Sequence, residues 1–258
     1  MITSKTDRQT EVDKKLWRFL FPVTEREIKF LGGDGVFFSA INYKAIVRED
    51  TDKLIAVQKD SYKLVPNAEV IKPIMDQLDL LTTEYYIDES HSFVEDNRMR
   101  LQVTFPDLTL HDGESDIALS LFIHNSYDSS EGVRMYWGGI RGICSNGCVF
   151  GEVLAKYYAK HTSGIVVENL KEQIEDTYEQ IPVIQNRIEI LRNMESISNY
   201  EEKLPELFGK GLTNYVEEQP KADSAWVLYN QLTYYISHYV QQRMRASYQM
   251  KVSKLFQL

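Results

Sequence analysis

The sequence predicts an α+β fold, in which an antiparallel, β-rich first half carries a β-hairpin and one helix, and an all-helical second half packs on it. Strand-length segments rich in β-branched and aromatic residues, separated by turn residues, occupy most of residues 35–150. After Gly151, apolar residues recur every three or four positions, which is the period of a helix. These patterns divide the chain into an N-terminal helix and turn (1–34), a β-rich core (35–150) and a helical region (151–258).

The first elements are predicted by apolar spacing and by turn residues. An apolar pattern at helical spacing stops near Pro22, and two runs of β-forming residues are joined by the turn residues of Asp50–Asp52. The corner Val65-Pro66-Asn67 ends the extended chain and can cap a helix. The sequence therefore predicts, in order, a short helix within the first thirty residues that ends near Pro22, a hairpin of residues 36–47 and 54–57, and a helix over 68–80.

Four further strand-length segments follow, separated by turn-rich links, and then the helices. In the third of these segments, apolar side chains from Ile117 to Ile123 alternate with mixed ones, as expected for a sheet covered on one side. Ser224 is a favourable N-cap for the last helix, which is expected to run to about Lys251. The predicted strands are 85–94, 98–105, 117–124 and 133–143, and an earlier helix is predicted over 170–191.

The net charge of −9 argues against indiscriminate binding of nucleic acid or of an anionic membrane. The charge is uneven: Glu168–Glu218 holds twelve acids and five bases, whereas Ser224–Leu258 holds four bases and no acid. The chain has no run of eighteen apolar residues and no apolar stretch at its start, so neither a membrane partner nor secretion is expected. The expected location is the cytoplasm.

The two cysteines, Cys144 and Cys148, are too few for a disulfide framework. A structural zinc ion normally takes four ligands, and the chain has no matching second pair. No G-x-S-x-G motif is present, and His91 and His111 stand in strand or turn contexts. The sequence therefore predicts no catalytic residues, no metal and no cofactor.

The most unusual stretch runs from Asn125 to Cys148. Its polar cluster consists of His124, Asn125, Ser126, Asp128 and Asn146. One interpretation is structural, because asparagine, aspartate, serine and glycine form turns through bonds between side chain and backbone. The other is that two cations, Arg134 and Arg141, bind an anion beside these polar groups. Seven positions apart, they would share a face of the strand only if a bulge formed at Gly138-Gly139.

The sixteen tyrosines include several that stand near cations. Tyr62 lies beside Lys63 and close to Lys59. Aromatic faces next to cations can stack on the bases of a single strand while the cations contact phosphates. Tyrosines also fill half-buried positions at the edges of sheets and helices, so both interpretations stay open.

Four segments, in order along the chain, carry a family resemblance. They are residues 54–67 (LIAVQKDSYKLVPN), 123–130 (IHNSYDSS), 141–147 (RGICSNG) and 224–230 (SAWVLYN). Together they resemble the phage/plasmid-like family described as domain of unknown function 932. That resemblance implies a role in DNA replication, recombination or counter-defence, and it supplies no catalytic residues. The chain departs from the family at Tyr127, where members usually have histidine or aspartate.

The leading hypothesis is a non-enzymatic phage or plasmid protein that binds single-stranded DNA and assists annealing or replication, with self-association into a homo-oligomer. The predicted hairpin, helix and antiparallel sheet are also similar in outline to phage single-strand annealing proteins. The expected DNA contacts are Arg134, Arg141, Lys59, Lys63 and Tyr62. Two alternatives remain: a counter-defence or interaction protein that binds a host or phage protein, and an enzyme on a nucleotide. The enzyme would need a pocket around His124, Asn125, Asp128 and Arg141.

Overall fold

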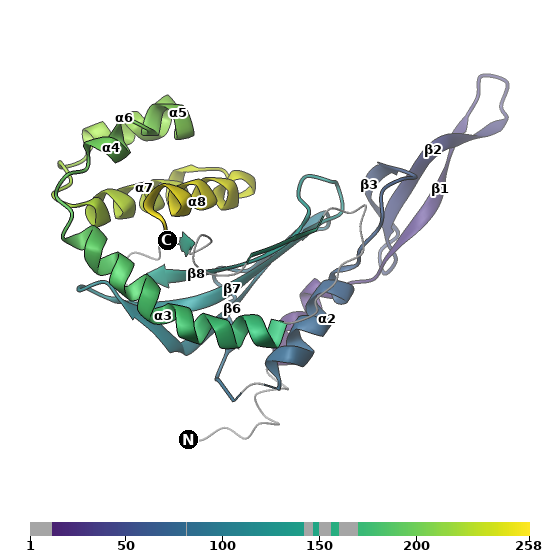
Figure 1. Ribbon diagram of the computed structural model, residues 1–258. Helices are drawn as coiled ribbons and strands as arrows, with labels where there is room; N and C mark the ends of the chain where they lie inside the picture. The colour runs from purple at the N-terminus through teal and green to yellow at the C-terminus, as the bar shows by residue number, and fades with distance from the viewer. Residues whose placement is uncertain (1–11, 81, 142–146, 150–155, 160–169) are drawn as a thin grey trace. The chain divides into compact units, whose positions relative to one another are not determined.

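The computed structural model shows two sheets and a set of helices (Figure 1). It describes residues 12–80, 82–141, 147–149, 156–159 and 170–258. Two compact units emerge, each built from separate stretches of chain. Unit 1 comprises Met1–Val103, Phe122–Met135 and Tyr157–Lys171, and unit 2 comprises Thr104–Leu121, Tyr136–Lys156 and Glu172–Leu258.

The first sheet, in unit 1, is an antiparallel meander in the order β1-β2-β3. Its strands are β1 (Val23–Leu31), β2 (Phe37–Arg48) and β3 (Lys53–Lys59). The predicted hairpin of β2 and β3 is confirmed, with Tyr43 paired to Lys59 at its far end. Only a turn was predicted immediately before this hairpin, but residues 23–31 also form a strand, β1, which pairs with β2.

Two helical segments precede the second sheet in unit 1. Residues 12–19 are helical and end in the 3-10 turn η1 (Trp17–Phe19), which confirms the short N-terminal helix. The helix α2 (Asn67–Leu78) begins directly after Pro66, close to the predicted start. Its apolar side chains Val70, Ile71, Ile74, Met75 and Leu78 are all buried, as their helical spacing predicts.

The second sheet has the strand order β10-β8-β7-β6-β4, with β5 paired to β6 and β9 paired to β8. Each of the four predicted strand segments contains strand structure. The bounds are β4 (Tyr86–Ile87), β5 (Phe93–Val94), β6 (Arg98–His111), β7 (Asp116–Ser126), β8 (Val133–Arg141), β9 (Gly147–Val149) and β10 (Lys156–Ala159). Both faces of β7 are buried over most of its length, rather than one face as predicted.

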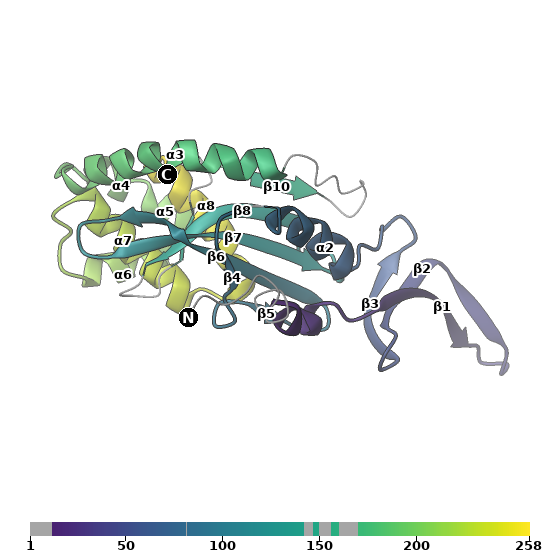
Figure 2. The same ribbon diagram turned by 90° about the horizontal axis from the view of Figure 1, so that it is seen from below.

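The remaining helices follow β10 (Figure 2), and all of them belong to unit 2 apart from residues 170–171. The expectation of an all-helical second half is wrong, because helices are spread along the chain and the strand β10 lies within the predicted helical region. Ser224 caps α7 as predicted, since its side chain accepts a bond from the Val227 amide. The helices are α3 (Leu170–Arg192), α4 (Ser198–Glu201), α5 (Leu204–Phe208), α6 (Lys210–Glu218), α7 (Ala225–Tyr239) and α8 (Gln242–Phe256). Among the described helices, none combines the length and apolar character needed to cross a bilayer.

Candidate anion-binding site

Polar side chains in unit 1 are buried on one face of the second sheet. Successive side chains of a strand point to opposite faces, so Phe122 and His124 of β7 share a face. The Arg100 guanidinium of β6 lies over the Phe122 ring, with Cζ 4.6 Å from the ring centroid. Arg100 therefore lies on the same face as His124, and both side chains are largely excluded from solvent.

Arg100 is a buried cation whose bonding capacity is not filled. The residue is 9% exposed, and its Nε atom is buried without a hydrogen-bond partner. Among the described residues, no carboxylate lies within ion-pair distance of its guanidinium. A buried charge without a counter-charge is costly, because desolvation is not offset by attraction to an opposite charge. The position therefore favours an anion beside Arg100.

His124 lies beside this cation and bonds to a carboxylate. Its Nδ1 atom is 3.2 Å from Oε2 of Glu131. Burial lowers the pKa of His124; the Glu131 bond works against this, and the positive charges of Arg100 and Arg134 add to the lowering. The imidazole is therefore neutral near pH 7, and Nδ1–H donates to the carboxylate. Burial alone would raise the pKa of Glu131, but the bond to His124 and the charge of Arg134 bring it below its usual value.

We refer to Arg100 and His124, which are buried, and the half-buried Arg134 as the buried basic cluster. It brings two guanidinium groups and one neutral imidazole together beside the Glu131 carboxylate. Guanidinium groups bind carboxylate and phosphate oxygens through short, charge-assisted hydrogen bonds. The chemistry of this arrangement is therefore binding of an anionic group.

The opposite face of β7 is structural. The Asn125 side-chain amide donates to the Val65 carbonyl and to Oδ1 of Asn67, at 2.9 Å in each case. The Tyr127 hydroxyl accepts a bond of 2.9 Å from the Asn67 amide, and both residues are buried. These contacts fasten β7 to the first turn of α2. The enzyme hypothesis requires His124 and Asn125 to line one pocket, but the two side chains point to opposite faces of β7.

The turn after β7 is held by its own side chains, as the structural interpretation predicts. The Ser126 hydroxyl donates to the Glu131 carbonyl at 2.7 Å and accepts from the Glu131 amide at 3.0 Å. Asp128 accepts bonds from the Ser130 amide at 2.9 Å and from the Asn97 side chain at 2.6 Å. Both side chains are thereby committed to shaping the turn that carries Glu131.

The predicted DNA contacts separate in the structure. The Tyr62 ring packs in an apolar core cluster with Phe21, Ile46 and Tyr127, and its hydroxyl donates to the Ser126 carbonyl at 3.1 Å, so no face of the ring is left for stacking on a base. Lys59 and Lys63 lie on either side of it in the sequence, and both are exposed. Arg134 belongs to the buried basic cluster. Pairing of β8 with β9 is regular through Gly138 and Gly139, so this pairing lacks the bulge that would bring Arg134 and Arg141 onto one face.

Several predicted residues lie wholly or partly outside the described part of the chain. The side chain of Arg141, the last residue of β8, and the whole of Asn146 and Cys144 lie outside the described part of the chain. Cys148 is described only as a backbone partner of Gly139. Groups of three or more potential metal ligands are absent from the described residues.

Sequence reasoning missed two members of the site, Arg100 and Glu131. A signal for Arg100 was present, because Arg98, Arg100 and Gln102 alternate with apolar residues along a predicted strand. A charged residue flanked by apolar neighbours in a central strand indicates a buried polar face. Glu131 had no such signal, because a glutamate in a turn is usually solvated.

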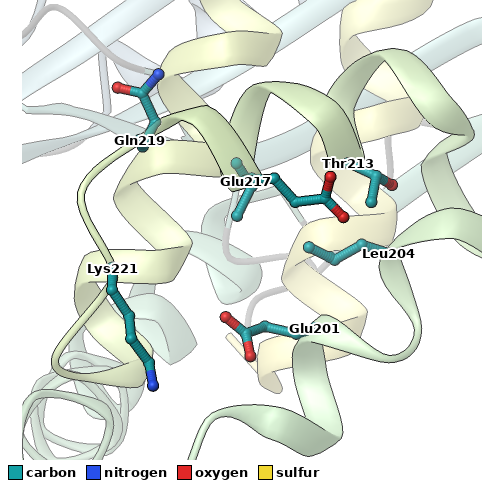
Figure 3. A pocket seen from close by; sticks show the side chains of 7 residues that line it. Glu201, Leu204, Thr213, Glu217, Gln219 and Lys221 are labelled. Carbon is teal, nitrogen blue, oxygen red and sulfur yellow. The ribbon is translucent and has the colours of Figure 1, made fainter.

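The helices of unit 2 carry two surface features. Tyr215 of α6 lies 5.0 Å from Tyr235 and 5.6 Å from Tyr239 of α7, between ring centroids, and Tyr239 is 62% exposed. A hollow of about 320 Å³ is lined by residues of α4, α5, α6 and the link between α6 and α7. Figure 3 shows Glu201 and Glu217 at this hollow with Lys221 at its side. Two carboxylates and one ammonium give an acidic balance, which disfavours phosphate there.

These features define an α+β protein with a cationic cluster buried on an antiparallel sheet. A family model described as Domain of unknown function (DUF932) matches residues 54–257, so the chain belongs to this family. The resemblance inferred from the four sequence segments is thereby confirmed. No curated protein and no solved structure matches the chain.

Proposed function

We propose that the chain is a non-enzymatic phage- or plasmid-type protein that acts on DNA, and that it holds a single strand by a phosphate contact at the buried basic cluster. The observation that carries this proposal is Arg100, a guanidinium enclosed by protein with an unfilled donor and no carboxylate partner in the described chain. Arg134 supplies a second cation to the same cluster. A phosphate oxygen matches the charge and the donors of this arrangement.

The net charge of −9 restricts how such binding can work. Long-range attraction to DNA is weak for an acidic protein, so affinity has to come from local contacts. On the three-stranded sheet the cations are mostly neutralised: Arg26 pairs with Asp52 at 2.8 Å and Lys44 with Glu25 at 2.8 Å. The exposed Lys59 is free of such pairing among the described residues, and it is the better candidate for an outer phosphate contact.

Fluorescence anisotropy with a labelled single strand tests the proposal. We expect binding that weakens steeply with salt, because phosphate contacts release counterions. The double variant Arg100→Gln, Arg134→Gln should bind at least tenfold more weakly, about 1.4 kcal/mol. Arg26→Gln is the matched control, since Arg26 is exposed and already paired with Asp52. Absence of binding at low salt, with circular dichroism confirming a folded protein, would contradict the proposal.

A second function, binding of a host or phage protein, is favoured by a different observation. Large apolar side chains are exposed at the end of the β1–β2 hairpin, including Phe37 at 65% and Ile41 at 80%. Apolar surface of this kind marks protein interaction sites. The enzyme alternative has less support, because its residues His124 and Asn125 face opposite sides of β7.

A further inference from the structure

The β1–β2 hairpin continues past the end of β3 as a two-stranded extension, which Figure 1 shows at the end of the first sheet. Pairing between β2 and β3 begins at Tyr43, so the residues before it have only β1 as a neighbour. The pairing register between β1 and β2 shifts at Glu27/Lys29, and Asn42 has a left-handed backbone with φ 70°. We refer to residues 30–43, beyond this irregularity, as the hairpin tip.

The turn of the hairpin tip has a defined geometry. The Gly35 amide donates to the Gly32 carbonyl at 3.0 Å, and the Gly32 amide donates to the Val36 carbonyl at 2.8 Å. Gly35 has φ 77°, a left-handed conformation that glycine adopts without strain. This is a three-residue hairpin loop with a glycine bulge, and it fixes the register of the strands that follow. Phe30 is thereby paired with Phe38, and their rings stack at 5.9 Å.

The hairpin tip presents apolar side chains to solvent and carries almost no charge. Asp34 is its one charged residue. Seven large side chains are 45–80% exposed: Phe30, Leu31, Val36, Phe37, Phe38, Ile41 and Tyr43. With about 150–250 Å² for a large aromatic side chain, the seven leave roughly 700 Å² in water. A two-stranded ribbon is marginally stable alone, so an extension of this composition gains from a cover.

The charges and the area indicate what covers it. The tip has no cation and carries Asp34 at its loop, so neither DNA nor an anionic lipid surface is complementary to it. A second copy of this chain offers the same apolar patch, in which the single charge, Asp34, lies in the loop and not among the seven apolar side chains. Stable interfaces bury about 800 Å² per partner, and homodimer interfaces are the more apolar ones. Phe30 and Phe38 lie on one face of the ribbon and Leu31 and Phe37 on the other, so a dimer approaches that area when each tip covers both faces of its partner. The backbone amides and carbonyls of Phe37 and Ser39 point away from β1 and form a short open strand edge. In the alternating pattern of an antiparallel pair, the hydrogen-bonded pairs here are Gly32 with Val36 and Phe30 with Phe38.

We propose that the hairpin tips of two copies of this chain pack against one another and form a symmetric dimer. Such a contact is isologous, with the same residues contributed by each copy. It is independent of the buried basic cluster, so the dimer and the DNA proposal can fail separately.

Sedimentation velocity of the full chain at several concentrations tests the dimer. The wild type is expected to approach about twice the 30.0 kDa chain mass as concentration rises. The variant Phe37→Lys, Ile41→Lys should raise the dimer dissociation constant at least tenfold, because it places charges inside the contact. Trp17→Lys and Leu80→Lys are matched controls at side chains that are 72% and 67% exposed elsewhere. These controls should leave dimerisation unchanged.

Circular dichroism and thermal melting establish that each variant is folded, which is expected because the replaced side chains lie largely in water. A wild type that stays monomeric up to about 100 µM, or a dimer that survives the Phe37→Lys, Ile41→Lys change, would overturn the proposal. So would a monomer that binds a host or phage protein, vesicles or single-stranded DNA through these two residues, since the tip would then have a different partner.

Discussion

Tyr127 offers a sharp test of how the sheet is fastened to α2. The change Tyr127→Phe removes one hydroxyl and keeps the ring, which packs edge-on against Phe21 with centroids 6.0 Å apart. The hydroxyl accepts the Asn67 amide at 2.9 Å, and the two residues are 0% and 1% exposed. The change therefore isolates one buried hydrogen bond at the start of a helix.

The expected cost follows from the group that is left behind. A buried amide without an acceptor loses its hydration and gains nothing in return, which costs about 1–3 kcal/mol. For a protein of this size, each kcal/mol lowers the melting temperature by roughly 2–4 °C. Urea denaturation at pH 7 followed by circular dichroism measures the loss. Tyr239→Phe is the control, because Tyr239 is 62% exposed and its loss should be within about 0.5 kcal/mol.

The same hydroxyl gives a pH test with a defined sign. Burial raises the pKa of Tyr127 above its usual 10.0, so the folded chain holds the proton more tightly than the unfolded chain does. Its contribution to stability is complete below pH 10 and is lost as the pH rises above it. Tyr127→Phe should therefore flatten part of the alkaline loss. A change of less than about 0.5 kcal/mol at pH 7 would refute the assignment of this bond. An unaltered alkaline profile would refute the burial of the hydroxyl, which is the cause of the raised pKa.

Three further predictions concern single side chains. Burial lowers the pKa of His124 below 6.5, so wild-type stability should fall below pH 6.5, and His124→Gln should fall less when melting temperatures are compared at pH 7.5 and 5.5. Burial alone would raise the pKa of Asp88, but its bonds to His91 lower it from 3.8 to about 2. The stabilisation from Asp88 is therefore lost as the pH drops below 3.8, and the Asp88→Asn variant should lose less stability than the wild type in an acid titration. Ser224→Ala should destabilise the folded state by about 1 kcal/mol in urea, because it removes the cap of α7, whereas Ser198→Ala, at a residue that caps nothing, should not.

Strand β1 shows where sequence patterns fail. Residues 23–31 include Glu25, Arg26, Glu27 and Lys29, and most of the strand is exposed. A strand with no buried face has no apolar alternation, so the signal used to find β2 and β7 is missing. The hairpin and α2 were predictable because turn residues and an apolar stripe mark them directly. Strand β10 lacks both kinds of mark.

The site shows a different limit. His124 and Asn125 are neighbours in a predicted strand, so their opposite orientation could be inferred from the period of two, although the enzyme hypothesis placed them together. Arg134 was identified from its charge, and its partner Arg100 was not, because that pairing depends on which strands are adjacent. Strand order is set by packing of the whole chain, which local patterns do not contain.

The interleaving of the two units has a consequence for how the chain reaches its native state. Strand β6 begins in one unit and ends in the other, and unit 1 takes its last stretch from Tyr157–Lys171. During synthesis, unit 1 cannot be completed until more than half of the chain has been made. Contacts between residues distant in sequence slow folding and lengthen the exposure of unpaired strands. Nascent chains that stop before this stretch should therefore depend on chaperones to stay free of aggregation.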